Sequence, residues 1–142
     1  MALPVFSGDW AAAWSDVLNA SDRYRESAAD WEGAIVFEMT AEPSHGLEED
    51  RRVWMDLWKG TCREGRVATE ADLNDAPFVI SADPATWKRI FGKEVDPLLA
   101  LMQGRLKLTR GNMATLARYV GAAKELVACA TQVETAFPHS DH

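Results

Sequence analysis

Several features that mark enzymes, exported proteins and membrane proteins are missing from this sequence of 142 residues. Its two cysteines, Cys62 and Cys129, are too few for a disulfide framework in a chain of this size, and we expect reduced thiols. No apolar run approaches the roughly 18 residues that span a bilayer. The first residues carry no basic region of the kind that begins a signal peptide. The expected location is therefore the cytoplasm.

The residue patterns that carry catalysis or bind metals are also missing. The histidines, His45, His139 and His142, have no Cys, His or acidic neighbour at metal-ligand spacing. The glycines are not gathered in a phosphate-binding loop, and no serine lies in a nucleophile-elbow pattern. Cys129 falls in an alanine-rich helix, where a buried, inert thiol is expected. We therefore predict no catalytic residue, no metal site and no cofactor, and a protein that is not an enzyme.

The charge is acidic overall but unevenly spread. The formal net charge is −7, which argues against sequence-independent nucleic-acid binding, because such binding needs a basic surface. Residues 1–50 hold eleven acidic and two basic residues, whereas residues 86–124 hold eight basic residues against two acidic ones. Two interpretations stay open for the basic segment. It is either a solvated face with partners in the acidic first third, or a surface for an anionic headgroup, a coenzyme A phosphate or a membrane.

The spacing of the apolar residues predicts an α+β domain. Trp10, Ala13, Trp14 and Val17 recur at helical spacing, and from Ile35 onward the period changes to two. The expected helices cover residues 6–30 with a break at Ser21-Asp22, 83–91, 96–102 and 112–133, and the expected strands cover residues 35–40, 52–58, 62–68, 78–80 and 105–109. This order predicts a five-stranded, mostly antiparallel sheet with helices packed on one face.

Between residues 78 and 120 the chain carries a specific series of short motifs. In order, these are Ala82-Asp83, Gly92-Lys93, Asp96-Pro97, Met102-Gln103-Gly104-Arg105-Leu106-Lys107 and Gly111-Asn112-Met113. Their order and spacing resemble the signature of the sterol carrier (sterol transfer) family. A similar upstream hairpin extends the resemblance to about residues 33–125. The chain departs from the family pattern in a Trp-rich N-terminal extension, and in an end, Ser140-Asp141-His142, that is not the peroxisomal signal of some members.

The resemblance implies both a fold and a function. It implies an apolar tunnel between sheet and helices, and non-catalytic binding and transfer of fatty acid, fatty acyl-CoA, phospholipid or sterol, without a cofactor. Residues 33–134 would form this lipid-binding domain, residues 1–32 a helical extension packed on it, and residues 135–142 a polar tail. The alternative is an interaction or regulatory subunit that uses the same fold with a filled core. The expected partners are an apolar small molecule and, transiently, a membrane surface, but no nucleic acid. We expect a monomer or homodimer.

Apolar residues that we expect to point inward form the predicted lipid site. These are Ile35, Phe37, Met39, Met55, Leu57, Met102, Leu106, Leu108, Met113, Leu116, Ala117 and Val120. The methionines among them suit promiscuous binding because their side chains adapt in shape, although ordinary core packing gives the same pattern. Arg105 and Arg118 are the predicted contacts for a ligand headgroup. Trp54 and Trp58, on the other face of their strand, are expected to pack beneath the N-terminal extension, form a dimer contact or anchor at a membrane interface.

Overall fold

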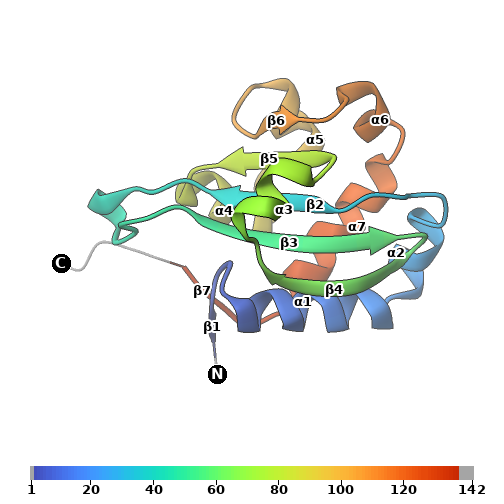
Figure 1. The fold of residues 1–142 in the computed structure, drawn as a ribbon, viewed down its shortest axis with the longest axis horizontal. Helices are drawn as coiled ribbons and strands as arrows, with labels where there is room; N and C mark the ends of the chain where they lie inside the picture. The colour runs from blue at the N-terminus through green and yellow to red at the C-terminus, as the bar shows by residue number, and fades with distance from the viewer. Residues whose placement is uncertain (1, 138–142) are drawn as a thin grey trace.

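The computed structural model describes residues 2–137, and its centre is a five-stranded sheet (Figure 1). The strands are β2 (Ile35–Met39), β3 (Arg51–Trp58), β4 (Thr61–Val67), β5 (Phe78–Ala82) and β6 (Lys107–Arg110). Their order across the sheet is β4-β3-β2-β5-β6. The neighbours β2 and β5 run parallel, and the other three pairs are antiparallel. The predicted α+β fold with a five-stranded, mostly antiparallel sheet is therefore confirmed.

Side chains alternate between the two faces of the sheet, as the period of two predicted. On β3, Val53, Met55 and Leu57 are buried on one face, and Trp54 and Trp58 are half-buried on the other. The buried set belongs to the main hydrophobic core, so we call this side the core face. The cavity described below lies on the core face.

The two half-buried tryptophans of β3 stack on arginines. The Arg66 guanidinium lies over the Trp54 ring, 4.1 Å from its centroid, and the Arg63 guanidinium lies 4.8 Å from the centroid of Trp58. The N-terminal helix packs into the core on the opposite face, where its Trp14 belongs to the main cluster. The expectation that Trp54 and Trp58 pack beneath the N-terminal segment is therefore wrong. A dimer contact or membrane anchoring through these residues stays a prediction.

Capping residues determine where most of the helices begin and end. The helices are α1 (Gly8–Ala20), α2 (Asp22–Ser27), α3 (Glu70–Asp75), α4 (Pro84–Phe91), α5 (Pro97–Met102), α6 (Met113–Ala117) and α7 (Val120–Ala130), with a 3-10 turn, η1, at Pro43–His45. Ser21 separates α1 from α2, and its hydroxyl accepts a hydrogen bond from the Tyr24 amide at 3.1 Å. Asp83 and Asp96 cap α4 and α5, each followed by proline. The predicted break and both predicted Asp-Pro helix starts are confirmed.

The last helical segment is broken, contrary to the prediction of one helix over residues 112–133. Asn112 caps α6, and α7 begins only at Val120. Between them, Tyr119 has a non-helical backbone with φ −113° and ψ 37°. Its ring packs edge-on against Trp31 at a centroid distance of 4.9 Å, and its hydroxyl donates to the carbonyl of Asp30 at 3.2 Å. The break depends on these contacts with a distant segment, which the local sequence pattern does not encode.

Both ends of the described chain meet in a second, two-stranded sheet. β1 (Leu3–Pro4) pairs in parallel with β7 (Thr135–Ala136), and neither strand was predicted. The half-buried Phe137 packs against Phe91 with 6.2 Å between ring centroids. Residues 135–137 of the predicted polar tail thus lie against the core. Residues 138–142 lie outside the described residues.

A short helix that the sequence did not predict, α3, covers the face opposite the core face (Figure 1). Leu73 of α3 and the following Ala76 pack there against Val36 and Val79. The guanidinium of Arg110 in β6 donates to the carbonyl of Leu73 at 2.8 Å and so holds the end of α3 on the sheet. Helices are therefore not confined to one face as predicted. In Figure 1, α3 lies in front of the sheet and α7 behind it.

The edge strand β4 approaches α1 very closely. A Cβ atom added at Gly65 would lie 2.5 Å from the carbonyl oxygen of Ala11 and 3.0 Å from the sulfur of Met55. Side chains are not normally found at such distances, so the absence of a side chain at position 65 permits this packing. The N-terminal helix is thereby fixed on the sheet.

Replacing Gly65 with alanine is expected to lower the free energy of unfolding by about 1–3 kcal/mol, because the backbone of α1 must move away. Urea denaturation measures the change. Gly8→Ala, at the same interface, is the matched control, since its added Cβ would meet Val67 at an ordinary 3.7 Å. Equal stability of Gly65→Ala and the unmodified protein would contradict the close approach of α1 to β4.

Candidate functional site

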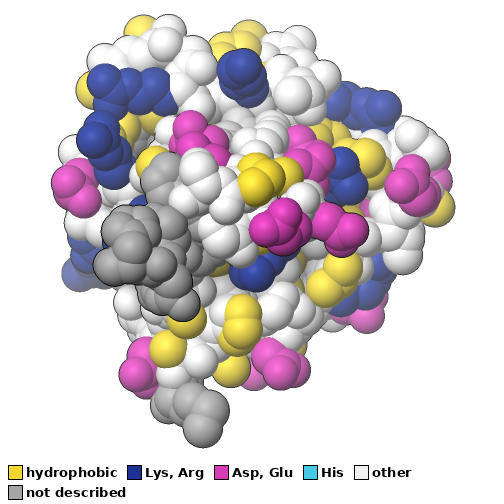
Figure 2. Space-filling model, turned by 90° about the vertical axis from the view of Figure 1, so that its left-hand side faces the viewer, with side chains coloured by type: hydrophobic (Ala, Val, Ile, Leu, Met, Phe, Trp, Pro, Cys, Tyr) yellow, Lys and Arg dark blue, Asp and Glu magenta, His cyan; other side chains and the backbone are white. Residues whose placement is uncertain are grey.

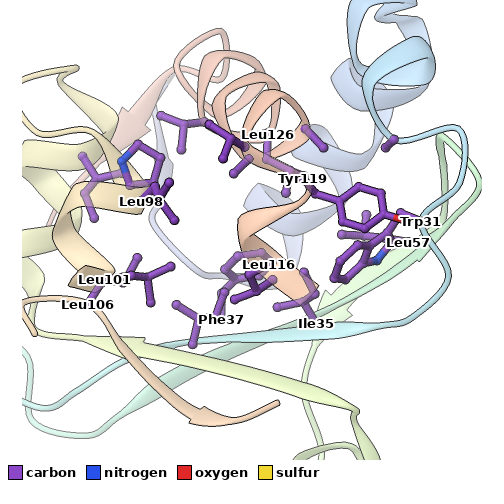
Figure 3. A pocket seen from close by; sticks show the side chains of 18 of the residues that line it. Trp31, Ile35, Phe37, Leu57, Leu98, Leu101, Leu106, Leu116, Tyr119 and Leu126 are labelled. Atoms are coloured by element: carbon purple, nitrogen blue, oxygen red, sulfur yellow. The ribbon is translucent and has the colours of Figure 1, made fainter. Parts of the chain in front are cut away.

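An apolar cavity lies between the core face of the sheet and α7 (Figure 3). Ile35, Phe37, Leu57 and Ile80 line it from the sheet. Every α-helix except α3 adds at least one residue to the wall. The side chains in Figure 3 are almost entirely carbon where they face the space between them. The wall of the cavity is therefore apolar.

The two ends of the cavity are lined by different kinds of side chain. At one end, Leu98 and Leu101 of α5 and the following Leu106 form an aliphatic wall. At the other end, the wall contains the aromatic rings of Trp31 and Tyr119. The aliphatic end comes from a helix of six residues, which is too short to be stable without tertiary contacts.

α7 covers the cavity largely with small side chains. Ala122 and Ala123 line the cavity together with Val120, Leu126 and Val127. Because alanine fills little volume, this part of the helix leaves space above the sheet.

The polar atoms of four aromatic wall residues are bonded to the backbone. The indole N–H groups of Trp14, Trp31 and Trp87 donate to carbonyls at 3.0, 2.7 and 2.8 Å respectively. The Tyr119 hydroxyl is bonded to the Asp30 carbonyl. Burial raises the pKa of Tyr24, so its hydroxyl stays neutral. The aromatic walls therefore offer a ligand mainly apolar surface.

The cavity is small in this conformation. Its volume is about 70 Å³, which accommodates a few water-sized groups, since one water needs roughly 10–15 Å³. Ligand pockets usually measure roughly 300–1,000 Å³. A lipid tail therefore fits only if part of the wall moves. We call α5 and α6 the lid helices, because they are short, wall the cavity and lie at the outside of the molecule.

Half of the predicted lipid-site residues line the cavity. These are Ile35, Phe37, Leu57, Leu106, Leu116 and Val120. Met39 and Met55 point inward as expected but are fully buried in the core beside the cavity rather than in its wall. Leu108 is half-buried against the core. Contact of any of these residues with a lipid stays a prediction.

Three predicted site residues point to solvent instead, so the expectation that they face inward is wrong. Met102 is 72% exposed, Met113 is 40% exposed, and Ala117 is also exposed. The reason is the short length of the lid helices. α5 turns Leu98 and Leu101 inward, and α6 turns Leu116 inward, so residues on the other side of each helix face outward.

The predicted headgroup residues Arg105 and Arg118 are both exposed and lie outside the apolar cavity. Arg105 lines a second, more polar depression, together with Asp83, Thr86 and Arg89. Two guanidinium groups therefore face this depression. A headgroup role for Arg105 and Arg118 stays a prediction.

Sequence reasoning missed the contribution of the first 32 residues to the cavity. Trp14, Tyr24, Ala28 and Trp31 all line it. The helical spacing of the tryptophans indicated a buried face, but nothing local indicated what that face would cover. For Leu98 and Leu101, the sequence signal of an inward face is their spacing of three positions on α5.

In the part of the chain that the structure describes, neither the cysteines, the potential metal ligands nor the helices provide a reactive or membrane-spanning feature. Burial raises the pKa of Cys62 and of Cys129, so both thiols are protonated and poorly nucleophilic. Among residues 2–137, no group of three His, Cys, Asp or Glu side chains is arranged to hold a metal ion. Within the same range, no helix combines the length and apolarity needed to cross a bilayer.

Sheet, helices and cavity together define a small α+β domain with an internal apolar site. The model of the SCP-2 sterol transfer family matches residues 15–124, so this chain belongs to that family. A crystal structure of sterol carrier protein 2 is 39% identical, with a TM-score of 0.83, and the match covers 91% of this chain and 98% of that chain. A solution structure of a conserved hypothetical protein from Thermus thermophilus is 40% identical, with a TM-score of 0.83 and coverage of 93% and 91%.

More distant structures share the fold. Sterol carrier protein 2 from Yarrowia lipolytica, in its apo form, is 16% identical with a TM-score of 0.59, over 89% of each chain. A search of curated proteins finds no match. The family resemblance predicted from the motifs is confirmed. The match also begins earlier than the predicted residue 33, because residues 15–32 belong to it.

Replacing Tyr119 with alanine is expected to loosen α6 without unfolding the sheet, since Tyr119 holds the α6–α7 junction on Trp31 and Asp30. We expect amide exchange in residues 113–120 to rise at least about tenfold and that of β2 and β3 to stay unchanged. Tyr119→Phe, which loses one hydrogen bond, should raise exchange about fivefold or less. Hydrogen-exchange mass spectrometry measures this, and a uniform rise over the whole chain would contradict a local role.

Proposed function

We propose that this protein binds one apolar ligand in the cavity and exchanges it without chemical change, in the cytoplasm. The ligand class is fatty acid, fatty acyl-CoA, phospholipid or sterol. One observation carries the proposal: the wall is apolar, and its three tryptophans and Tyr119 have their polar atoms already bonded to the backbone. Such a wall selects for apolarity rather than for a particular functional group. Membership of the SCP-2 sterol transfer family supports the same function.

The energetics are sufficient for a carrier. Transfer of a tail of about 15 methylenes out of water gains about 12 kcal/mol, at about 0.8 kcal/mol per CH₂. Association costs at least about 4 kcal/mol, which leaves affinity in the micromolar range without directional contacts. Part of this gain must also displace the lid helices, because the cavity measures only about 70 Å³.

Outside the cavity, we propose that Arg105 and Arg118 contact an anionic headgroup. Both side chains are exposed, and each follows one of the lid helices in the sequence, Arg105 after α5 and Arg118 after α6. The carboxylate or phosphate of a ligand would then stay at the surface while its tail lies in the cavity. We expect a monomer or homodimer that meets membranes transiently.

The small cavity volume favours a second candidate function. A domain with so little internal space could serve as a non-enzymatic interaction or regulatory subunit whose core is simply filled. The two functions differ in one respect that can be measured. A carrier opens in the presence of lipid, and a filled domain does not.

Native mass spectrometry of the purified protein tests the proposed function. We expect a stoichiometric adduct of a fatty acid, phospholipid or sterol, identified after organic extraction. Binding of a fluorescent fatty acid at micromolar concentration provides a second readout. A clean apo mass together with no fluorescent binding would instead support the interaction subunit.

Filling the cavity should weaken ligand binding while keeping the fold. Ala123→Leu adds three carbon atoms to the cavity wall. We expect the affinity for fluorescent fatty acid to fall at least about tenfold, and the free energy of unfolding to rise by up to about 1–2 kcal/mol as the void closes. Ala117→Leu, on the exposed side of α6, is the matched control and should change neither value. Unchanged affinity of Ala123→Leu would show that the ligand lies elsewhere.

A further inference from the structure

We propose that the edge of the molecule formed by α5, β6 and α6, residues 97–118, docks on an anionic phospholipid bilayer. The proposal deepens the proposed function and rests on it, because it names the surface through which the lipid ligand would be exchanged. We call these residues the docking edge.

The first argument is the charge of this part of the chain. Residues 97–124 contain five basic residues and no acidic one, although the chain as a whole has 15 basic and 22 acidic residues. The Arg110 guanidinium donates hydrogen bonds to backbone carbonyls at the end of α3. The Lys124 Nζ lies 4.0 Å from a carboxylate oxygen of Asp96. The remaining three, Arg105, Lys107 and Arg118, are exposed and form no ion pair among the described residues.

The second argument is that apolar side chains are exposed on the same edge. Of the four large hydrophobic residues that are exposed in residues 2–137, three lie on the lid helices: Leu99 at 47%, Met102 at 72% and Met113 at 40%. Exposed apolar residues accompanied by cations are typical of segments that enter the interfacial region of a bilayer. At the upper end of the view in Figure 2, hydrophobic and basic side chains lie together, and acidic side chains lie lower.

The third argument links the docking edge to the cavity. Leu98, Leu101 and Leu116 line the cavity from the lid helices, and Leu99, Met102 and Met113 lie on the outward side of the same helices. Insertion of the outward residues among lipid headgroups would therefore shift the lid helices, and with them the inward residues that line the cavity. Docking would open the cavity where a lipid is available, and the ligand would not cross water.

The net charge of the molecule does not prevent this docking. At physiological ionic strength, charges are screened over about 8 Å, so the nearest residues outweigh distant acidic ones. A simpler explanation for part of the pattern is that basic residues on the outermost strand β6 block edge-to-edge aggregation. That explanation accounts for Lys107, but it leaves the exposed Leu99 and Met102 without a reason.

Flotation with vesicles tests the proposal. We expect the protein to bind vesicles of equal parts phosphatidylglycerol and phosphatidylcholine, to ignore pure phosphatidylcholine vesicles, and to lose binding as salt rises. Arg105→Glu with Lys107→Glu should weaken binding at least about 25-fold, at about fivefold per basic residue lost. Arg23→Glu on α2, which replaces an exposed arginine far from the docking edge in the sequence, should have no effect.

The apolar contribution is tested separately. Met102→Gln with Met113→Gln should weaken vesicle binding at least about tenfold, whereas Val67→Gln, at an exposed valine on β4, should leave it unchanged. Folding of each variant is checked by circular dichroism. Equal binding by the docking-edge variants and their controls would overturn the proposal. No vesicle binding at low salt would also overturn it and would favour edge protection or an acidic protein partner.

Fatty-acid binding without vesicles separates this proposal from the proposed function. If the unmodified protein binds fluorescent fatty acid but no anionic vesicle, the docking edge is wrong and the proposed function stands. If it binds anionic vesicles through the docking edge and takes up no fatty acid, the proposed function is wrong and the docking edge stands. The variant with Met102→Gln and Met113→Gln, whose side chains lie outside the cavity and which keeps Arg105, should retain its affinity for fatty acid in solution within about threefold.

Discussion

Hydrogen bonds from buried indole groups connect the walls of the cavity to distant parts of the chain. Trp14 donates to the carbonyl of Leu126 in α7 at 3.0 Å, and Trp87 donates to the carbonyl of Glu38 in β2 at 2.8 Å. A buried N–H group without a partner costs free energy, so each tryptophan has to keep its partner within bonding distance. The positions of α7 over α1, and of α4 over the sheet, depend on this constraint.

This constraint divides the wall of the cavity into two parts. Where tryptophans are bonded to carbonyls and packed in an aromatic cluster, the wall is held by directional contacts. The lid helices contribute leucines, whose contacts with the core have no directional requirement. A conformational change that admits a ligand therefore costs least at the lid helices. The ligand would meet a fixed aromatic surface on one side and an adaptable aliphatic surface on the other.

The sequence predicted those elements whose cause is local. The alternation on β3, the serine between α1 and α2, and the Asp-Pro starts of α4 and α5 are each encoded within a few residues. The errors have non-local causes. The break at Tyr119 depends on Trp31, nearly ninety positions away, as the Tyr119–Asp30 bond with its separation of 89 shows. The outward orientation of Met102 and Met113 likewise depends on how two very short helices are placed against the sheet, which no periodicity over five or six residues can determine.

The pairing of the chain ends has a consequence for the order in which the protein folds. The indole N–H of Trp10 in α1 donates to the Thr135 hydroxyl, 125 positions away, and β1 pairs with β7. Contacts of such long sequence separation carry a large loop-closure entropy and slow folding. On the ribosome, α1 is synthesised well before Thr135 and β7, which form part of its final environment. Until then, the aromatic side chains of α1 lack some of their native partners, so the nascent chain passes through a stage at which the tryptophans of this helix are incompletely covered.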